Sequence, residues 1–150
     1  MKVKEIMTKN PTCCTPDTNL QQVARMMLDC NCGEIPVVES QQTMKPIGVV
    51  TDRDIACRVV AQGQNPLQKT AKDCMTKPAI TVTPETSLEE CCQLMEKRQI
   101  RRVPVVDQKG ACCGMVAQAD LAKYAPEEET ATFLKEVSEP AGASSRVGAR

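Results

Sequence analysis

The feature that most constrains the fold of this chain is an internal repeat. When the 150-residue sequence is shifted by 68 positions, similar segments fall on one another in the same order. Ile6-Met7-Thr8-Lys9 aligns with Cys74-Met75-Thr76-Lys77, and Ile35-Pro36-Val37-Val38 aligns with Val103-Pro104-Val105-Val106. An ordered self-similarity of this kind indicates that one structural unit occurs twice.

The repeat sets the expected boundaries of the units. We expect a first unit at residues 3–60, a linker at 61–70 that is polar and contains Gly and Pro, and a second unit at 71–124. Residues 125–137 are expected to form a C-terminal helix whose apolar side chains Phe133, Leu134 and Val137 dock on the module or on a partner subunit. The small, polar residues 138–150 are expected to be a disordered tail.

Each unit is predicted to run strand–helix–strand–strand–helix, which gives a mixed α/β (α+β) fold. The first strand is expected at Thr12 to Thr15 in one unit and at Ile80 to Thr83 in the other. Thr18 and Thr86 are each followed three residues later by Gln or Glu, which is typical of a capping box at a helix start. The apolar runs that follow are typical of buried strands.

Composition argues against several classes of function. The chain has 19 basic and 19 acidic residues and no histidine. A balanced charge disfavours a nucleic-acid-coating surface, and the lack of histidine removes the usual general base from nucleophile pairs. We therefore expect no enzyme, no catalytic residues and no nucleic-acid partner. No apolar run is long enough for a membrane span and no signal peptide is visible, so we expect a cytoplasmic protein with reduced thiols and no membrane partner.

The ten cysteines are mostly explained by the repeat. Six of them align with an aliphatic residue in the other unit: Cys14, Cys32, Cys74, Cys91, Cys92 and Cys113. A free cysteine behaves as a small hydrophobic residue, so these six are expected in the core, with a disulfide or a metal role as the alternatives. Cys30 aligns with Arg98 and is not covered by this explanation; Cys13 and Cys112 are minor open cases, and Cys57 is unassigned.

The paired motifs resemble the CBS (cystathionine-β-synthase) domain family, in particular a stand-alone tandem pair, or Bateman module. The resemblance rests on the h-Pro-h-h runs (h, apolar) at residues 35–38 and 103–106. It also rests on the segments Gly48-Val49-Val50-Thr51-Asp52-Arg53-Asp54 and Gly114-Met115-Val116-Ala117-Gln118-Ala119-Asp120. It covers about residues 3–124. It implies two β-α-β-β-α motifs related by a pseudo-twofold axis, with two clefts that commonly bind adenosine ligands.

The resemblance also implies site residues. In the family the Asp that ends the glycine segment holds the ribose and the Thr or Ser binds ribose or phosphate. This is reasonable chemistry, because a carboxylate accepts two hydrogen bonds from a diol and a helix N-terminus attracts phosphate. The first cleft would then contain Thr51, Arg53, Asp54, Ala79, Ile80, Ile100, Arg101, Arg102 and Val103. The alternative is that Thr51 and Asp54 only cap their own helix.

The second cleft departs from the pattern. It would combine Ala117 and Asp120 with Cys32, Gly33 and Glu34. Ala117 stands at the position of Thr51, so this cleft lacks the threonine hydroxyl of the first. Glu34 also stands where the first cleft has Arg102, and a carboxylate there should oppose a phosphate. We expect the first cleft to be the better nucleotide site. The second is expected to be empty or to take a nucleoside-like or longer ligand.

The function implied is that of a non-catalytic regulatory module for energy sensing. It would bind AMP, ADP or ATP, or else NAD or S-adenosylmethionine, and signal to an unknown regulated protein. A homodimer is expected, through helix faces at Ile55 and Val59 or at Leu88 and Met95. The alternative is a thiol-based redox- or metal-responsive protein on the same scaffold, with Cys30 and Cys32 as its residues. No metal ligand is assigned under the leading hypothesis.

Overall fold

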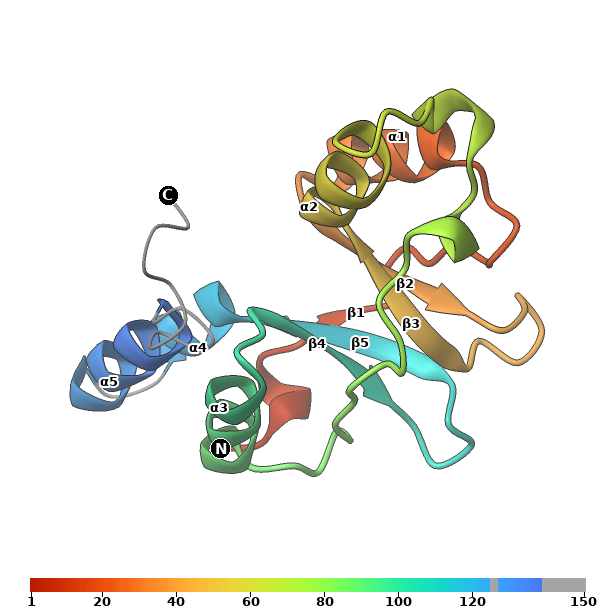
Figure 1. Ribbon diagram of the computed structural model, residues 1–150. Coiled ribbons are helices and arrows are strands. Elements are labelled where there is room, and N and C mark those ends of the chain that lie inside the picture. Colours follow the sequence, from red (N-terminus) through yellow and green to blue (C-terminus); the bar gives the residue numbers. More distant parts are fainter. Residues whose placement is uncertain (125–126, 139–150) are drawn as a thin grey trace.

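The computed structural model describes residues 1–124 and 127–138, which form two similar lobes joined along their sheets (Figure 1). We call these lobes the first and the second motif. The first motif contains α1 (Leu20–Cys30), β2 (Glu34–Val38), β3 (Pro46–Thr51) and α2 (Asp52–Ile55), which continues as a π-helical turn over Ala56–Val60. The second contains α3 (Leu88–Arg98), β4 (Arg102–Val106), β5 (Cys112–Ala117) and α4 (Gln118–Tyr124).

The first helix of each motif starts one residue later than expected. Asn19 caps α1, with its Oδ1 accepting a hydrogen bond from Gln22 N at 2.8 Å, and Ser87 caps α3 in a capping box with Glu90. The predicted cap Thr18 instead accepts a hydrogen bond from Thr15 N at 3.0 Å, which closes the turn before the helix. The prediction for Thr18 and Thr86 was therefore wrong by one position. The hydroxyls stabilise the preceding turn rather than the helix end.

Two antiparallel hairpins form the centre of the molecule. In β2–β3, Pro36 is opposite Val49, and in β4–β5, Pro104 is opposite Met115, so the two registers agree with the repeat. The predicted first strands at 12–15 and 80–83 are reduced to single parallel bridges, from Cys14 to Val37 and from Val82 to Val105. Thr15-Pro16 and Thr83-Pro84 end the extended segment at once, because proline cannot donate to a ladder.

The segment in front of each motif pairs with the other motif. Strand β1 (Thr8–Lys9) lies antiparallel to β5, with Thr8 opposite Met115. In the same way Thr76 pairs with Val49 of β3, through two main-chain hydrogen bonds of 2.9 and 2.8 Å. Each hairpin is thus completed by a strand or bridge that the sequence places in the opposite unit.

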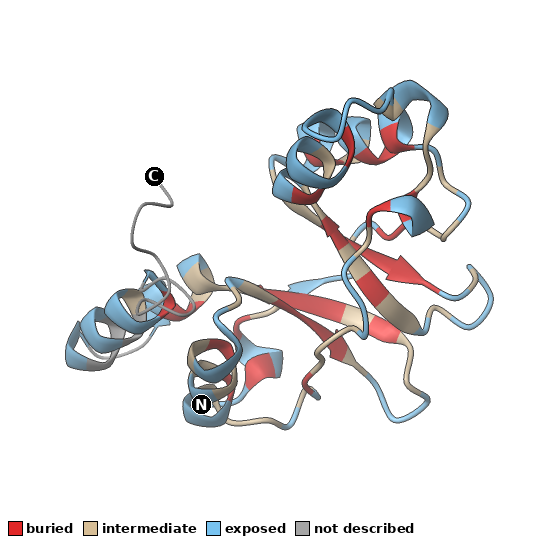
Figure 2. Cartoon of the chain, viewed as in Figure 1, coloured by how far each residue is buried: buried red, intermediate tan, exposed pale blue. Residues whose placement is uncertain are grey.

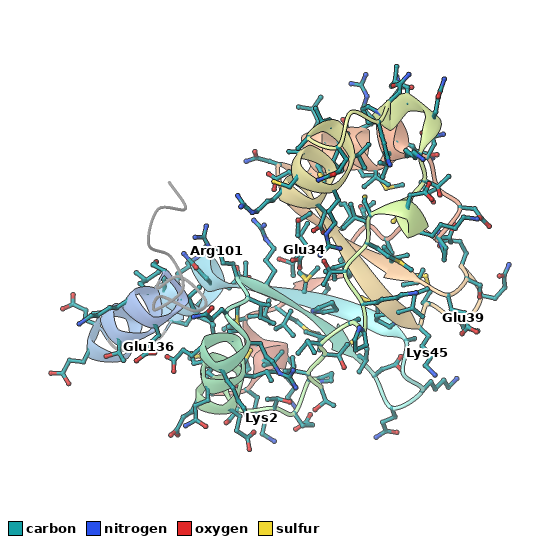
Figure 3. All side chains as sticks on the ribbon, viewed as in Figure 1. Lys2, Glu34, Glu39, Lys45, Arg101 and Glu136 are labelled. Carbon is teal, nitrogen blue, oxygen red and sulfur yellow. The ribbon has the colours of Figure 1, made fainter. Side chains whose placement is uncertain are left out.

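The same exchange fills the two hydrophobic cores. Val3 and Ile6 are buried in the core of the second motif, against Met95 and Leu121 among others. Their repeat counterparts Ala71 and Cys74 are buried in the core of the first motif. Lys2, labelled in Figure 3, and Lys4 hold Glu85 of the second motif through exposed ion pairs of 2.6 and 2.8 Å, which contribute little by themselves. The main attachment is apolar burial.

The cysteines follow the repeat as predicted. Cys14, Cys74 and Cys91 are buried, and Cys32, Cys92 and Cys113 are half-buried and packed against the two cores. Buried positions in Figure 2 follow the strands and the inner faces of the helices. All ten cysteines are free thiols.

The C-terminal helix α5 (Glu127–Ser138) lies beside α3 and α4 (Figure 1), and its Val137 is buried in the second core with Leu134 packed alongside. The side chain of Phe133 and the tail at 139–150 lie outside the described residues. Among the described helices, none is both long and apolar enough to cross a lipid bilayer.

The expected dimer faces need correction. Val59 and Met95 are fully buried in the cores of their own motifs, and only Ile55 and Leu88 of the four named residues are half-exposed. The apolar spacing that suggested an interface therefore serves the fold within one chain. A homodimer stays a prediction, without these two residues as contacts.

Two equivalent glycines offer a test of the exchanged segments. A Cβ at Gly48 would stand 2.7 Å from the carbonyl oxygen of Thr76, which is main chain and cannot easily move. A Cβ at Gly114 would meet the sulfur of Met7 at 2.5 Å, and a thioether can rotate away. We expect Gly48→Ala to lower the free energy of unfolding by about 2 kcal/mol and Gly114→Ala by about 1 kcal/mol. Urea denaturation of both variants measures this; equal losses would contradict the difference between a rigid main-chain contact at Gly48 and a rotatable side-chain contact at Gly114, and no loss in either variant would contradict the close packing of the exchanged segments.

Candidate functional site

A cavity of about 340 Å³ lies where the two motifs meet, on the second of the two clefts. Its volume is within the range of small-molecule sites, about 300–1,000 Å³. It draws residues from β1 and the following loop, from the first motif and from β5 and α4. The lining residues are Thr8, Asn10, Pro11, Thr12, Cys30, Cys32, Glu34, Ile35, Pro36, Arg102, Met115, Ala117 and Asp120.

Asp120 is held in place by the helix on which it lies. It is in the first turn of α4, and its Oδ2 accepts a hydrogen bond from Ala117 N at 2.8 Å. This local contact fixes the carboxylate at the cavity wall. Thr8 and Thr12, on the opposite motif's segment, add hydroxyl groups to the same wall. The arrangement combines a carboxylate with hydroxyls, which suits a ligand that carries several hydroxyl groups.

Glu34 is the most perturbed group of this cavity. Burial raises the pKa of its carboxyl to about 7, the Arg102 guanidinium opposes this rise, and Asp54 adds to it. Within the described residues its Oε2 is buried and has no hydrogen-bond partner. Figure 3 shows Glu34 between the two lobes. A buried oxygen without a partner costs free energy unless a proton or a ligand satisfies it.

Arg102 is the repeat counterpart of Glu34 and also reaches this region. It lines the cavity and, together with Gly33 and Asp52, a second and more open recess next to it. Two equivalent positions of the repeat thus carry opposite charges close to the pseudo-twofold axis. The attraction between these two side chains affects the pKa of Glu34: burial raises this pKa, and the nearby Arg102 guanidinium lowers it in part.

The equivalent aspartate of the first cleft, Asp54, is already bonded. Its Oδ2 accepts from Thr51 N at 3.0 Å, while Thr51 Oγ1 accepts from Asp54 N at 3.0 Å, so the two residues form a capping box. Thr76 Oγ1 lies 3.4 Å from both carboxylate oxygens, and Arg58 Nε lies 3.6 Å from Oδ1. Thr51 and Asp54 therefore do cap their own helix. Such a cap is compatible with ligand contact, because Asp120 makes the same local hydrogen bond and still lines the cavity.

The other residues predicted for the first cleft differ in exposure. Arg53 and Arg101 are exposed, and Arg101 is labelled in Figure 3 near the start of β4. Ala79, Ile80 and Ile100 are half-buried. The side chain of Val103 is fully buried in the second core opposite Val116, so only its main chain could touch a ligand.

Of the predicted site residues, Arg102 and Asp120 are the two that line the cavity. The sequence interpretation also grouped Ala117, Cys32 and Glu34 at this cleft, but it did not include Thr8 and Asn10 of the exchanged segment. The repeat held a signal for Thr8, because it aligns with Thr76, whose hydroxyl approaches Asp54.

Two thiols stand at the cavity wall. Cys30 is exposed with its Sγ 3.3 Å from Thr12 Oγ1, and Cys32 is half-buried with its Sγ 3.6 Å from the carbonyl oxygen of Glu34. Across the described ranges, no three Cys, Asp or Glu side chains gather in a way that could hold a metal ion.

Comparison with known proteins identifies the class to which this fold and its clefts belong. The CBS domain family model matches residues 3–60 and 71–127, which is most of the chain. The chain belongs to the CBS domain family and contains a tandem pair of these domains.

Individual relatives support this assignment. The chain is 41% identical over 129 residues to the CBS domain-containing protein YhcV of Bacillus subtilis, covering 86% of this chain and 89% of the relative. It is 30% identical over 137 residues to hypoxic response protein 1 of Mycobacterium tuberculosis, covering 91% and 94%. A crystal structure of Hypoxic Response Protein I with two coordinated zinc ions matches with a TM-score of 0.75 at 29% identity, covering 84% of this chain and 100% of that one.

Adenosine ligands are present in some of the similar structures. The CBS domain pair of protein MJ0100, in complex with 5′-methylthioadenosine and S-adenosyl-L-methionine, matches with a TM-score of 0.73 at 28% identity. The match covers 82% of this chain and 98% of that one.

The raised pKa of Glu34 predicts a pH-dependent stability. The unfolded carboxyl ionises near its ordinary value of 4.5, whereas the folded one keeps its proton up to about pH 7. The folded state therefore binds more protons between these values, so this group's contribution falls as pH rises from about 4.5 to 7 and is constant above. We expect Glu34→Gln to stabilise the protein at pH 8 by about 2 kcal/mol and to change little at pH 4.5. Urea denaturation at both pH values measures this; an equal effect at both would contradict a Glu34 carboxyl that keeps its proton in the folded state.

Proposed function

We propose that this protein is a non-catalytic regulatory module that binds an adenosine-containing ligand between its two CBS motifs. The observation that carries the proposal is the cavity of about 340 Å³ lined by Asp120 from one motif and Thr12 from the other. The MJ0100 pair, which holds 5′-methylthioadenosine and S-adenosylmethionine on the same fold, supports this ligand class.

The cavity favours a ligand without phosphate. Asp120 is an acceptor for a ribose diol, and the apolar side chains Ile35, Pro36 and Met115 offer a surface for a flat base. Once Glu34 is ionised, the wall holds the two carboxylates of Glu34 and Asp120 against the one guanidinium of Arg102, and this excess of negative charge disfavours a phosphate. We infer that the second cleft takes a neutral or cationic adenosyl compound, of which 5′-methylthioadenosine and S-adenosylmethionine are suitable probes.

The first cleft is the better place for a nucleotide phosphate. Thr51 and Asp54 lie at the start of α2, and Arg53, which is exposed, lies between them in the first turn. Arg101 is exposed as well, and a guanidinium binds phosphate through two parallel hydrogen bonds. We propose AMP, ADP, ATP or NAD as the ligand class of this cleft.

A ligand bound in either cleft would change how the two motifs pack against each other. The cavity wall is made from both motifs, so a bound ligand contacts both and favours the relative arrangement that it fits. A regulated partner, or a second copy of this chain in a homodimer, would recognise that arrangement.

The test is a calorimetric and thermal-shift titration of the full chain with each of these compounds. A ligand that binds the folded state raises its melting temperature.

Asp120→Asn keeps the hydrogen bond to Ala117 N but removes the charge and half of the diol contact; we expect it to weaken 5′-methylthioadenosine binding by about tenfold, or about 1.4 kcal/mol. Asp54→Asn is the matched control and should leave that ligand unaffected while weakening AMP. If none of the compounds binds the wild-type protein, the proposal is overturned.

The exposed thiol of Cys30 gives an independent readout. It lines the cavity, so an occupant should slow its alkylation by N-ethylmaleimide, while Cys57, which is exposed and does not line the cavity, should react at an unchanged rate. Equal protection of both thiols would point to a general stabilisation rather than to occupancy of this cavity.

A further inference from the structure

Two buried cysteines are not explained by the repeat. Cys13 and Cys112 align with Thr81 and Pro46, so neither replaces an aliphatic core residue of the other motif. Nevertheless both are buried, with 8% and 7% of their surface exposed. They belong to neither main core. Instead they share a separate small cluster with Val38, and Met44 packs against it.

The two thiols come from different motifs and meet at this cluster. Cys13 directly precedes the residue that bridges to β2, and Cys112 is the first residue of β5. Both side chains pack in this one small cluster, and each thiol shifts the pKa of the other. The main chain holds one side of the cluster in place, since Cys112 N donates to the carbonyl oxygen of Met44 at 2.7 Å. The pair therefore lies across the junction of the two motifs.

The environment gives the two thiols different roles. The interaction with the Cys112 thiol lowers the pKa of Cys13, and the interaction with Cys13 together with burial raises the pKa of Cys112. The Sγ atoms also lie 3.4 Å from the carbonyl oxygen of Pro11 and 3.6 Å from that of Gly114, respectively. A thiolate is the reactive form of cysteine, so Cys13 is suited to attack and Cys112 to follow as the second thiol.

The neighbouring cysteines are less suited to react. Burial raises the pKa of Cys14 to about 12, and it also raises the pKa of Cys113. Each of these residues adjoins one member of the pair in sequence. They serve as matched controls for chemistry that depends on position rather than on residue type.

We propose that Cys13 and Cys112 are an oxidation site at which a hydroperoxide forms a disulfide between the two motifs. The Cys13 thiolate attacks one peroxide oxygen, an S–O bond forms, the O–O bond breaks, and the departing hydroxide takes up a proton to become water. The Cys112 sulfur then attacks Cys13, the S–S bond forms, the S–O bond breaks, and a second water leaves. Two thiols are oxidised by two electrons and one hydrogen peroxide is reduced to two waters.

The cross-link would join strand β5 to the segment that forms part of the cavity. Pro11 and Thr12 line the cavity and directly precede Cys13, while Met115 and Ala117 of β5 line it from the other side. Oxidation would therefore fix the two walls of the cavity relative to one another. This site is independent of the identity of the ligand and goes beyond the proposed function.

The first test is mass spectrometry of the full chain treated with hydrogen peroxide and then alkylated. We expect a loss of two hydrogens per molecule that dithiothreitol reverses. Trypsin should release a linked pair of the peptides 10–25 and 110–123, which hold Cys13 and Cys112 together with Cys14 and Cys113. Absence of this linked pair, with oxidation confined to Cys30 and Cys57, would overturn the proposal.

Variants assign the bond within these peptides. Cys13→Ser and Cys112→Ser should each abolish the linked pair, whereas Cys14→Val and Cys113→Ile, which carry the residue of the other motif, should keep it. Persistence of the link in Cys13→Ser or Cys112→Ser, or its loss in both controls, would contradict the assignment. Circular dichroism confirms that each variant is folded.

Thermal unfolding gives a second readout on the wild type. A cross-link that closes so long a loop restricts the unfolded chain, and we expect the oxidised protein to melt about 10 °C higher than the reduced one. Cys13→Ser should show no such difference between oxidising and reducing buffer. An oxidised wild type that melts at or below the reduced value would overturn the claim that the native arrangement brings the two thiols together.

Discussion

The whole structure depends on the reciprocal exchange of the two segments that precede the motifs. Val3 and Ile6 fill the core of the second motif, and Ala71 and Cys74 fill that of the first. Since burial of apolar side chains is the main favourable term in folding, neither core is complete without a segment from the other unit. The exchange also delivers β1 to β5, and with it Thr8 to the cavity. Core, sheet and site are thus consequences of one arrangement.

The backbone of the pair is nearly symmetric, but its chemistry is not. The hairpins share one register, and Asp54 and Asp120 make the same bond to a main-chain amide three residues earlier. Yet the second cleft has Glu34 at the position that Arg102 occupies in the first cleft. It also has Ala117, which carries no hydroxyl, at the position of Thr51. The two clefts therefore share one backbone frame but differ in the charge and the hydroxyl groups of their walls.

Much of this could be predicted from the sequence, because the repeat reports on packing. Aligned positions share an environment, which is why Cys74, aligned with Ile6, was correctly placed in a core, and why strands were expected at equivalent places in the two units. Local signals were less reliable. Thr18 matched a capping box, but its hydroxyl closes the preceding turn and Asn19 caps the helix.

Features that need the tertiary structure were not accessible in this way. The cavity lies at the cleft that seemed the poorer nucleotide site, and its wall joins residues of β1, the first motif, β5 and α4 that only the tertiary structure brings together. The protonation of Glu34 depends on its burial between the motifs, and the meeting of Cys13 with Cys112 joins residues from opposite ends of the chain. The sequence marked these cysteines only as exceptions to the repeat.

The exchanged segments also impose an order on folding during synthesis. The first motif lacks part of its core until Ala71 and Cys74 have left the ribosome, so a chain interrupted at the linker carries an open apolar surface. The N-terminal residues wait longer still, because the core that receives Val3 and Ile6 includes Leu121 and Val137 near the C-terminal end of the described chain. The first residues to be synthesised are therefore among the last to be buried. Their apolar side chains stay exposed to non-native contacts until the second motif has been synthesised.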